Sequence, residues 1–284
     1  MRADSPSGTS LLVSFARGLG VEDRPLDSLA AELLPPWLGR IASAPRYLGV
    51  AGSFYRNALR ASSFGLVDHA VLRTQAIDTH LVSALRSGIE QLVILGAGLD
   101  ARAWRLPALQ AATVFEVDHP ATQRYKRKRI GSRVAPTDVR YVPVDFEKEQ
   151  FSPSLVRAGF RMEDPSVWIW EGVTMYLHRQ AIGQTLEQLT KLSASGSELA
   201  VTYLVPNSLP FGALGRFAIP AMFKAAGEPL KGALDSRELA TAIAPSWEVV
   251  YDQDSRGWQE LTRSRARSPQ TFRSERLAVA KRRA

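Results

Sequence analysis

The chain has 284 residues, of which 45% are hydrophobic and 23% are charged, so its composition is that of an ordinary globular protein. It contains no cysteine, which excludes disulfides, thiolate zinc sites and cysteine nucleophiles. The formal net charge of +8 is concentrated in residues 124–133 and 263–283. No nucleic-acid motif accompanies these segments, so we interpret them as solvated basic faces and predict no nucleic-acid partner.

The sequence lacks two kinds of segment that would direct a protein to a membrane or out of the cell. The sequence has no apolar run of the roughly 20 residues that a membrane-spanning helix needs. Residues 1–10 are polar and lack the apolar stretch of a signal peptide. We therefore expect a cytoplasmic protein with no membrane partner.

Residues 1–88 are predicted to be helical and are assigned to an N-terminal helical cap segment. Pro35-Pro36 and Pro45 separate shorter helices, and Ser87-Gly88 is a stop signal for the last one. The apolar residues of this last helix recur near helical spacing: Leu66, Ala70, Ile77, Leu81 and Leu85.

From residue 91 onward, short apolar runs alternate with amphipathic stretches. The predicted strands are 92–95, 113–117, 141–144, 167–170, 199–204, 247–251 and 276–280. Helices are predicted at 120–130, with Pro120 in the first turn and Gly131 as a cap, and around 182–192, closed by Gly196. This alternation predicts an α/β fold with a mostly parallel sheet and helices on both faces.

Residues 206–234 interrupt the alternation and are rich in Pro, Gly, Phe and Leu. We interpret this segment as a cap insertion within a cofactor-binding domain that spans residues 89–284, because flexible linkers are seldom so apolar. Four of its residues could line an apolar substrate pocket or simply pack together: Phe211, Phe217, Met222 and Phe223.

The loop Gly96-Ala97-Gly98 follows the first predicted strand. Ligands of an open α/β sheet bind beyond the carboxyl ends of its strands, and small residues let a ligand approach the backbone. An ordinary tight turn could have the same sequence. The loop also lacks the full dinucleotide fingerprint, because Leu99 and Asp100 stand where further glycine is expected.

Acidic residues follow three further predicted strands. Asp118 lies about 20 residues after the glycine loop, where an acid can accept hydrogen bonds from a ribose. Glu116 shares its face but lies further from the strand end. The alternative is that Asp118 caps the helix opened by Pro120. The loop and the acid together predict a nucleoside ligand.

Asp145 could accept a hydrogen bond from the amino group of adenine, and the Phe146 backbone N–H could reach a ring nitrogen. An ordinary turn is the alternative. Glu171 ends a strongly apolar strand, and a buried acid needs a partner. The ammonium group of a methionine moiety could supply one, so the three acids together favour S-adenosylmethionine over a dinucleotide.

Three ordered segments resemble the leucine carboxyl methyltransferase family: 93–106 (VILGAGLDARAWRL), 115–120 (FEVDHP) and 171–177 (EGVTMYL). The resemblance runs from about Arg73 to Ser193. It implies the class I methyltransferase fold, with a Rossmann-like, mostly parallel seven-stranded sheet, and S-adenosylmethionine as cofactor without a metal. The family includes bacterial O-methyltransferases that act on small molecules such as polyketides.

The resemblance also implies roles for individual residues. Arg73 matches the arginine that holds the methionine carboxylate; without the resemblance it would be interpreted as a surface helix residue. The implied cofactor-binding residues are Arg73, Gly96, Gly98, Asp118, Asp145, Phe146 and Glu171. Phe146 replaces the usual leucine, which leaves the expected backbone contact possible.

On the acceptor side, Tyr176 matches a family tyrosine and is the candidate catalytic residue, with a core tyrosine as the alternative. His69, His80 and Arg46 are further candidates, and His119 is interpreted as a helix-entry residue. The predicted function is O-methylation of a carboxyl or hydroxyl group of an apolar small molecule. The alternatives are methylation of a protein C-terminal carboxylate and a nicotinamide-dependent oxidoreductase.

Overall fold

The computed structural model of the chain describes residues 6–21, 27–146, 148–206 and 229–284. Its α-helices are α1 (Gly8–Leu19), α2 (Ser28–Leu33), α3 (Pro36–Ser43), α4 (Val50–Ser62), α5 (Leu66–Arg86), α6 (Arg102–Arg105), α7 (Pro120–Ile130), α8 (Ser152–Arg157), α9 (Arg179–Leu192), α11 (Ser236–Ile243) and α12 (Ser255–Thr262). Its strands are β1 (Gln91–Leu95), β2 (Thr113–Asp118), β3 (Asp138–Pro143), β4 (Ser166–Trp170), β5 (Glu198–Leu204), β6 (Trp247–Gln253) and β7 (Glu275–Arg282).

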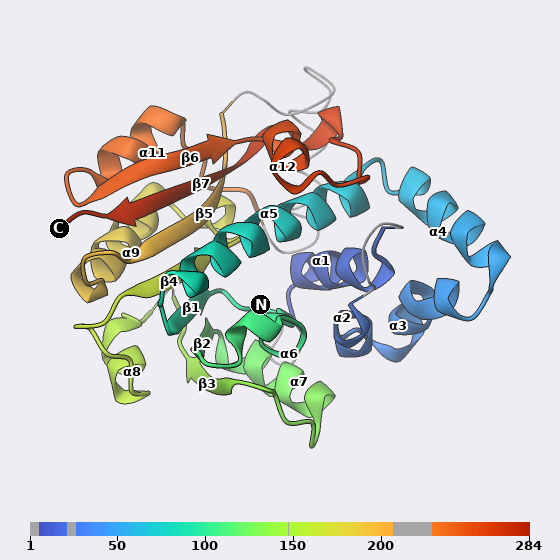
Figure 1. Ribbon diagram of the computed structural model, residues 1–284, viewed down its shortest axis with the longest axis horizontal. Helices are drawn as coiled ribbons and strands as arrows, with labels where there is room; N and C mark the ends of the chain where they lie inside the picture. The colour runs from blue at the N-terminus through green and yellow to red at the C-terminus, as the bar shows by residue number, and fades with distance from the viewer. Residues whose placement is uncertain (1–5, 22–26, 147, 207–228) are drawn as a thin grey trace.

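These strands form one 7-stranded sheet in the order β3-β2-β1-β4-β5-β7-β6 (Figure 1). The first five strands in this order are parallel to one another, and β7 runs antiparallel to both of its neighbours. The predicted α/β fold, with a mostly parallel seven-stranded sheet, is therefore confirmed.

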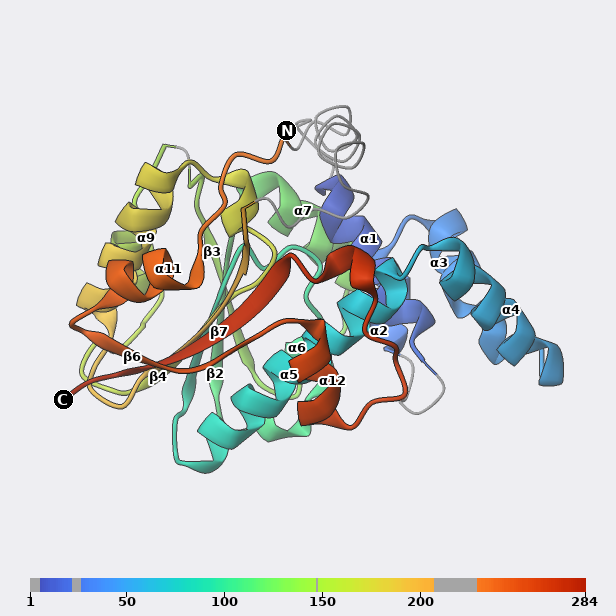
Figure 2. The same ribbon diagram turned by 90° about the horizontal axis from the view of Figure 1, so that it is seen from above.

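The central strands are continuous apolar runs because helices cover both of their faces. In β4, every residue is buried, and alternate side chains enter two different clusters. Trp168 and Trp170 pack with Leu186 of α9, whereas Val167 and Ile169 pack on the opposite face. Figure 2 shows α9 and α11 on one side of the sheet and α5 and α12 on the other.

The predicted N-terminal helices are present, but they pack against different parts of the structure. Helix α5 packs on the sheet itself through residues that include Leu72, Ile77 and Leu81. Helices α1 to α3 contact one another, and α1 also contacts α5. Helix α5 therefore belongs to the layer that covers the sheet. The assignment of all of residues 1–88 to a cap stays a prediction.

Six of the predicted strands begin and end within two residues of the observed ones, and the boundaries of two other elements differ more. The strand expected at 141–144 is Asp138–Pro143, at the edge of the sheet, where half-exposed residues weaken the apolar signal. The helix expected to close at Gly196 ends at Leu192. The central part of the predicted cap insertion, residues 207–228 with its four candidate pocket residues, lies outside the described residues.

Strands β1 and β4 are neighbours, and the chain leaves them in opposite directions along the sheet, toward β2 and toward β5. Their carboxyl ends therefore bound the crevice in which open α/β sheets bind ligands. In the part of the chain that the structure describes, no helix has both the length and the apolar character of a membrane span.

Candidate functional site

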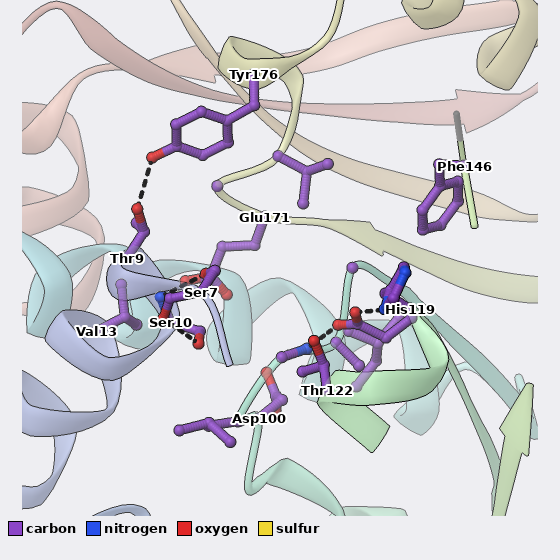
Figure 3. Close-up of a pocket in the computed structure, with 18 of the residues that line it drawn as sticks. Ser7, Thr9, Ser10, Val13, Asp100, His119, Thr122, Phe146, Glu171 and Tyr176 are labelled. Atoms are coloured by element: carbon purple, nitrogen blue, oxygen red, sulfur yellow. Dashed lines mark hydrogen bonds between the residues drawn. The ribbon is translucent and has the colours of Figure 1, made fainter. Parts of the chain in front are cut away.

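A cavity of about 480 Å³ lies at the carboxyl ends of β1, β2 and β4, and α1 forms another of its walls (Figure 3). This volume is within the usual range for small-molecule sites. The cavity brings together the seven implied cofactor-binding residues and the candidate catalytic residue: Arg73, Gly96, Gly98, Asp118, Asp145, Phe146, Glu171 and Tyr176.

The glycine loop after β1 depends on two left-handed residues. Gly96 and Gly98 have φ angles of +70° and +52°. A side chain at position 96 would also collide with Val173. The Val117 carbonyl accepts hydrogen bonds from the N–H groups of Gly96, at 2.8 Å, and Ala97, at 3.2 Å, and so ties the loop to β2. The glycines therefore let the backbone itself form the cavity wall.

Asp118 ends β2 and is half-buried beside this loop. One of its oxygens accepts a hydrogen bond from the Gly98 N–H, and the other accepts from the His119 N–H at 2.5 Å. Burial raises the pKa of Asp118, although both N–H donors oppose this effect. The residue that caps α7 is His119, whose Nδ1 accepts from the Ala121 N–H at 3.2 Å. Asp118 is therefore not the helix cap, and the prediction for His119 is confirmed.

Glu116 has a different environment, although it lies only two residues before Asp118. Its carboxylate is fully buried and accepts a hydrogen bond from Lys126 Nζ at 2.6 Å. Burial raises the pKa of Glu116 to about 7, even though Lys126 lowers it. Of these two acids, only Asp118 lines the cavity.

Asp145 and Phe146 lie just beyond β3, at a more open part of the cavity. Asp145 Oδ2 is 3.1 Å from Lys148 Nζ and 3.9 Å from His119 Nε2. The Phe146 ring packs against Phe151, with 6.2 Å between ring centroids. We call this part of the cavity, with Asp118, Asp145 and Phe146, the adenine end.

Glu171 lies at the opposite, buried part of the cavity, and its side chain is 7% exposed. Three arginines surround it: Arg17 Nη2 donates to both carboxylate oxygens at 2.8 and 2.9 Å, and Arg73 Nε and Arg102 Nη2 each donate at 2.9 Å. Burial alone would raise the pKa of Glu171, but the arginines outweigh it and hold the pKa well below its usual range. The partners expected of this buried acid are therefore supplied within the chain.

Arg73 is 6% exposed, so the interpretation of it as a surface helix residue is wrong. Its Nη1 donates to both oxygens of Glu275, at 2.8 and 2.9 Å. Burial would raise the pKa of Glu275, but Arg73 and His69 lower it to about 2. No described residue accepts a hydrogen bond from Arg73 Nη2, which lies beside Gly172 in the cavity wall. We call Arg17, Arg73 and Glu171 together the methionine end.

Several charged residues of this region were not predicted from the sequence. Arg17, Asp100 and Arg102 are all buried, and Arg102 donates to Asp78 at 2.7 Å as well as to Asp100. An arginine within the apolar segment 11–19 could have indicated a buried ion pair, because a buried arginine requires acidic partners. The identity of the partner, 154 residues away, could not be read from that signal.

Tyr176 lines the cavity near α1, and its hydroxyl oxygen lies 3.0 Å from Thr9 Oγ1 (Figure 3). The other acceptor-side candidates lie elsewhere. His69 Nε2 contacts Glu275 at 2.6 Å, and His80 packs on the Tyr251 ring at 4.7 Å between centroids. Neither histidine lines the cavity, and neither does Arg46.

Known proteins match this chain in sequence. The sequence model of the family described as leucine carboxyl methyltransferase matches residues 26–190. A protein of Mycobacterium avium, provisionally named an S-adenosyl-L-methionine-dependent methyltransferase, is 40% identical over 144 residues, which cover 50% of this chain and 46% of that protein. The chain thus spans about half the length of such relatives. A protein of the same name from Mycobacteroides abscessus is 34% identical over 201 residues, covering 69% of this chain and 66% of that protein.

Two crystal structures share the fold over almost the whole chain. A DUF574 family protein from Streptomyces avermitilis has a TM-score of 0.63 and 15% identity, with 98% of each chain covered. A protein of Thermobifida fusca, provisionally named a methyltransferase, has a TM-score of 0.63 and 16% identity, with 100% of this chain and 97% of that one covered. At these identities the likeness concerns the fold.

Proposed function

This chain belongs to the leucine carboxyl methyltransferase family, and we propose that it transfers a methyl group from S-adenosylmethionine to a carboxyl or hydroxyl oxygen of a small molecule. The observation that carries the proposal is the single cavity in which a glycine loop, three acids from three strand ends and a buried arginine meet. Together, these groups fit the parts of a nucleoside that carries an amino-acid tail.

In this proposal, each end of the cavity holds one part of the cofactor. Asp118 accepts hydrogen bonds from the ribose, because each of its oxygens has only one N–H donor from the chain. Asp145 and the Phe146 N–H bind the adenine edge. Arg73 Nη2 donates to the methionine carboxylate, and Glu171 provides the negative charge that faces the ammonium group.

The cofactor supplies a methyl group on a sulfonium, which leaves as a neutral thioether when an acceptor oxygen attacks the methyl carbon in line. The protein has to hold the acceptor oxygen about 3 Å from that carbon and to exclude water. A carboxylate acceptor is already ionised at neutral pH and needs no base. A hydroxyl acceptor benefits from one, and Tyr176 is the cavity residue we propose for that role or for orienting the acceptor.

The first test is a ligand titration that follows the fluorescence of the 6 tryptophans, one of which directly precedes Glu171. We expect saturable binding of S-adenosylhomocysteine and no saturable binding of NADH. The reverse result would exclude the methyltransferase and favour the nicotinamide-dependent oxidoreductase.

A second acceptor class has a specific observation in its favour, namely the family's description as leucine carboxyl methyltransferase. Incubation of a cell extract with the chain and methyl-labelled S-adenosylmethionine separates the two classes. We expect label in the organic extract. Base-labile label on a single protein band would instead show that a protein carboxylate is the acceptor.

A further inference from the structure

Arg17 of α1 belongs to the cavity, although no sequence motif points to it. Helix α1 contributes Thr9, Ser10, Val13 and Arg17 to the cavity wall, and their spacing places them along one face of the helix. Arg17 is the residue of this group that reaches the buried methionine end, where it contacts Glu171.

Most hydrogen-bond donors of Arg17 are already used by the chain. Nε donates to Thr74 Oγ1 at 2.9 Å, and Nη2 donates to the two Glu171 oxygens at 2.8 and 2.9 Å. Nη1 lies 3.5 Å from Asp100 Oδ2, at the limit of a hydrogen bond. A planar guanidinium held through Nε and Nη2 in this way fixes the orientation of the carboxylate it binds.

Arg73 differs from Arg17 in one respect that matters for a ligand. Its Nε and Nη1 hold Glu171 and Glu275, whereas no described residue accepts from its Nη2. Arg73 can therefore donate to a ligand without giving up a contact, whereas each side-chain nitrogen of Arg17 lies within 3.5 Å of an acceptor in the chain. The two arginines share Glu171 Oε1, so the position of that carboxylate determines how Arg73 is oriented.

We propose that Arg17 is a positioning residue for the methionine end of the cofactor, acting through Glu171 and Arg73. This inference rests on the proposed function. Because Arg17 comes from α1, it also makes binding of the amino-acid tail depend on the N-terminal helix. Binding of the nucleoside part, at the adenine end, does not depend on Arg17.

Two ligands test this division: S-adenosylhomocysteine and 5′-methylthioadenosine, which lacks the amino-acid tail. In Arg17→Lys, one ammonium cannot hold Glu171 at two points and Thr74 at a third. We expect calorimetric affinity for S-adenosylhomocysteine to fall by about tenfold or more and affinity for 5′-methylthioadenosine to change by less than about twofold. Thr74→Val removes the acceptor of the Arg17 Nε contact, together with the hydrogen bond from Thr74 Oγ1 to the Ala70 carbonyl within α5. It should weaken binding of S-adenosylhomocysteine alone, by a smaller factor, and it tests the inference if the lysine variant does not fold.

Arg105→Gln is the matched control, because it removes another arginine of the same charge network. Arg105 contacts Asp27 at 3.1 Å and Asp78 at 2.7 Å, and it does not line the cavity. We expect this variant to keep its affinity for both ligands, even where its melting temperature falls.

Three results would overturn the inference: equal loss of both ligands in Arg17→Lys, unchanged affinity for S-adenosylhomocysteine, or tighter binding of it. The last would mean that Arg17 occupies the place of the ammonium group and must leave. Failure of the unmodified chain to bind either ligand would instead refute the proposed function.

Discussion

The two ends of the cavity differ in how their acids are paired. At the methionine end, Glu171 is 7% exposed and receives hydrogen bonds from three arginines. At the adenine end, Asp118 and Asp145 are half-buried, and Asp145 pairs with an exposed lysine, Lys148. Acids at equivalent strand ends can therefore have different energetic roles. Under the proposed function, we expect Glu171 to contribute to both stability and cofactor binding, and Asp118 and Asp145 to contribute mainly to cofactor binding.

The largest effect is expected for Glu171→Gln, as a loss of free energy of unfolding. Removing this charge leaves three arginines facing a neutral amide, and breaking a buried ion pair costs about 3–5 kcal/mol. Urea unfolding of the chain should show a loss of this size. Asp145→Asn is the control and should change the free energy of unfolding by less than about 1 kcal/mol. Equal, small losses in both variants would remove the distinction between the two ends.

The buried acids themselves should respond to pH in opposite directions. The folded-state pKa of Glu275 is lowered to about 2, so its stabilisation is present above its ordinary pKa of 4.5 and is lost as pH falls below that value. The folded-state pKa of Glu116 is raised from 4.5 to about 7, so its ionisation reduces stability as pH rises through that interval.

For Glu116 this loss amounts to about 3 kcal/mol between pH 4.5 and 7. The measurement is the free energy of urea unfolding across this interval, in the unmodified chain and in Glu116→Gln. The variant should have the flatter profile, even if its stability is lower throughout because Lys126 loses its partner. Identical slopes would show that Lys126 keeps Glu116 ionised throughout.

At the adenine end, Asp118→Ala should weaken binding of S-adenosylhomocysteine by about hundredfold, because charged hydrogen bonds to the ribose are lost. Titration calorimetry measures this change. Asp138→Asn, an exposed position at the start of β3, should leave the affinity unchanged. Unaltered binding in Asp118→Ala would show that the ribose lies elsewhere.

The smallest effect is expected for Asp145→Asn, with a loss of less than about tenfold in affinity for S-adenosylhomocysteine. Its carboxylate is partly exposed and lies 3.1 Å from the ammonium group of Lys148, so solvent and this cation screen its contribution. An affinity loss as large as that of Asp118→Ala would show that this acid is desolvated when the ligand binds.

The sequence was sufficient to predict the sheet and the acids at its strand ends, because buried parallel strands are continuous apolar runs and their ends are local features. Arg73 came only from the family resemblance, since nothing in an amphipathic helix shows that one arginine is buried. Arg17 and Glu275 were missed because their partners lie 154 and 202 residues away. Such pairings are determined by how α1 packs against α5 and how α5 packs against the sheet that contains β7.

The central claim is that the cavity holds S-adenosylmethionine with its amino-acid tail at the buried end. A crystal structure with S-adenosylhomocysteine tests it most directly. We predict the ribose on Asp118, the adenine beside Asp145 and Phe146, and the amino-acid tail between Arg73 Nη2 and Glu171. A ligand bound in the reverse orientation, or outside this cavity, would contradict the account.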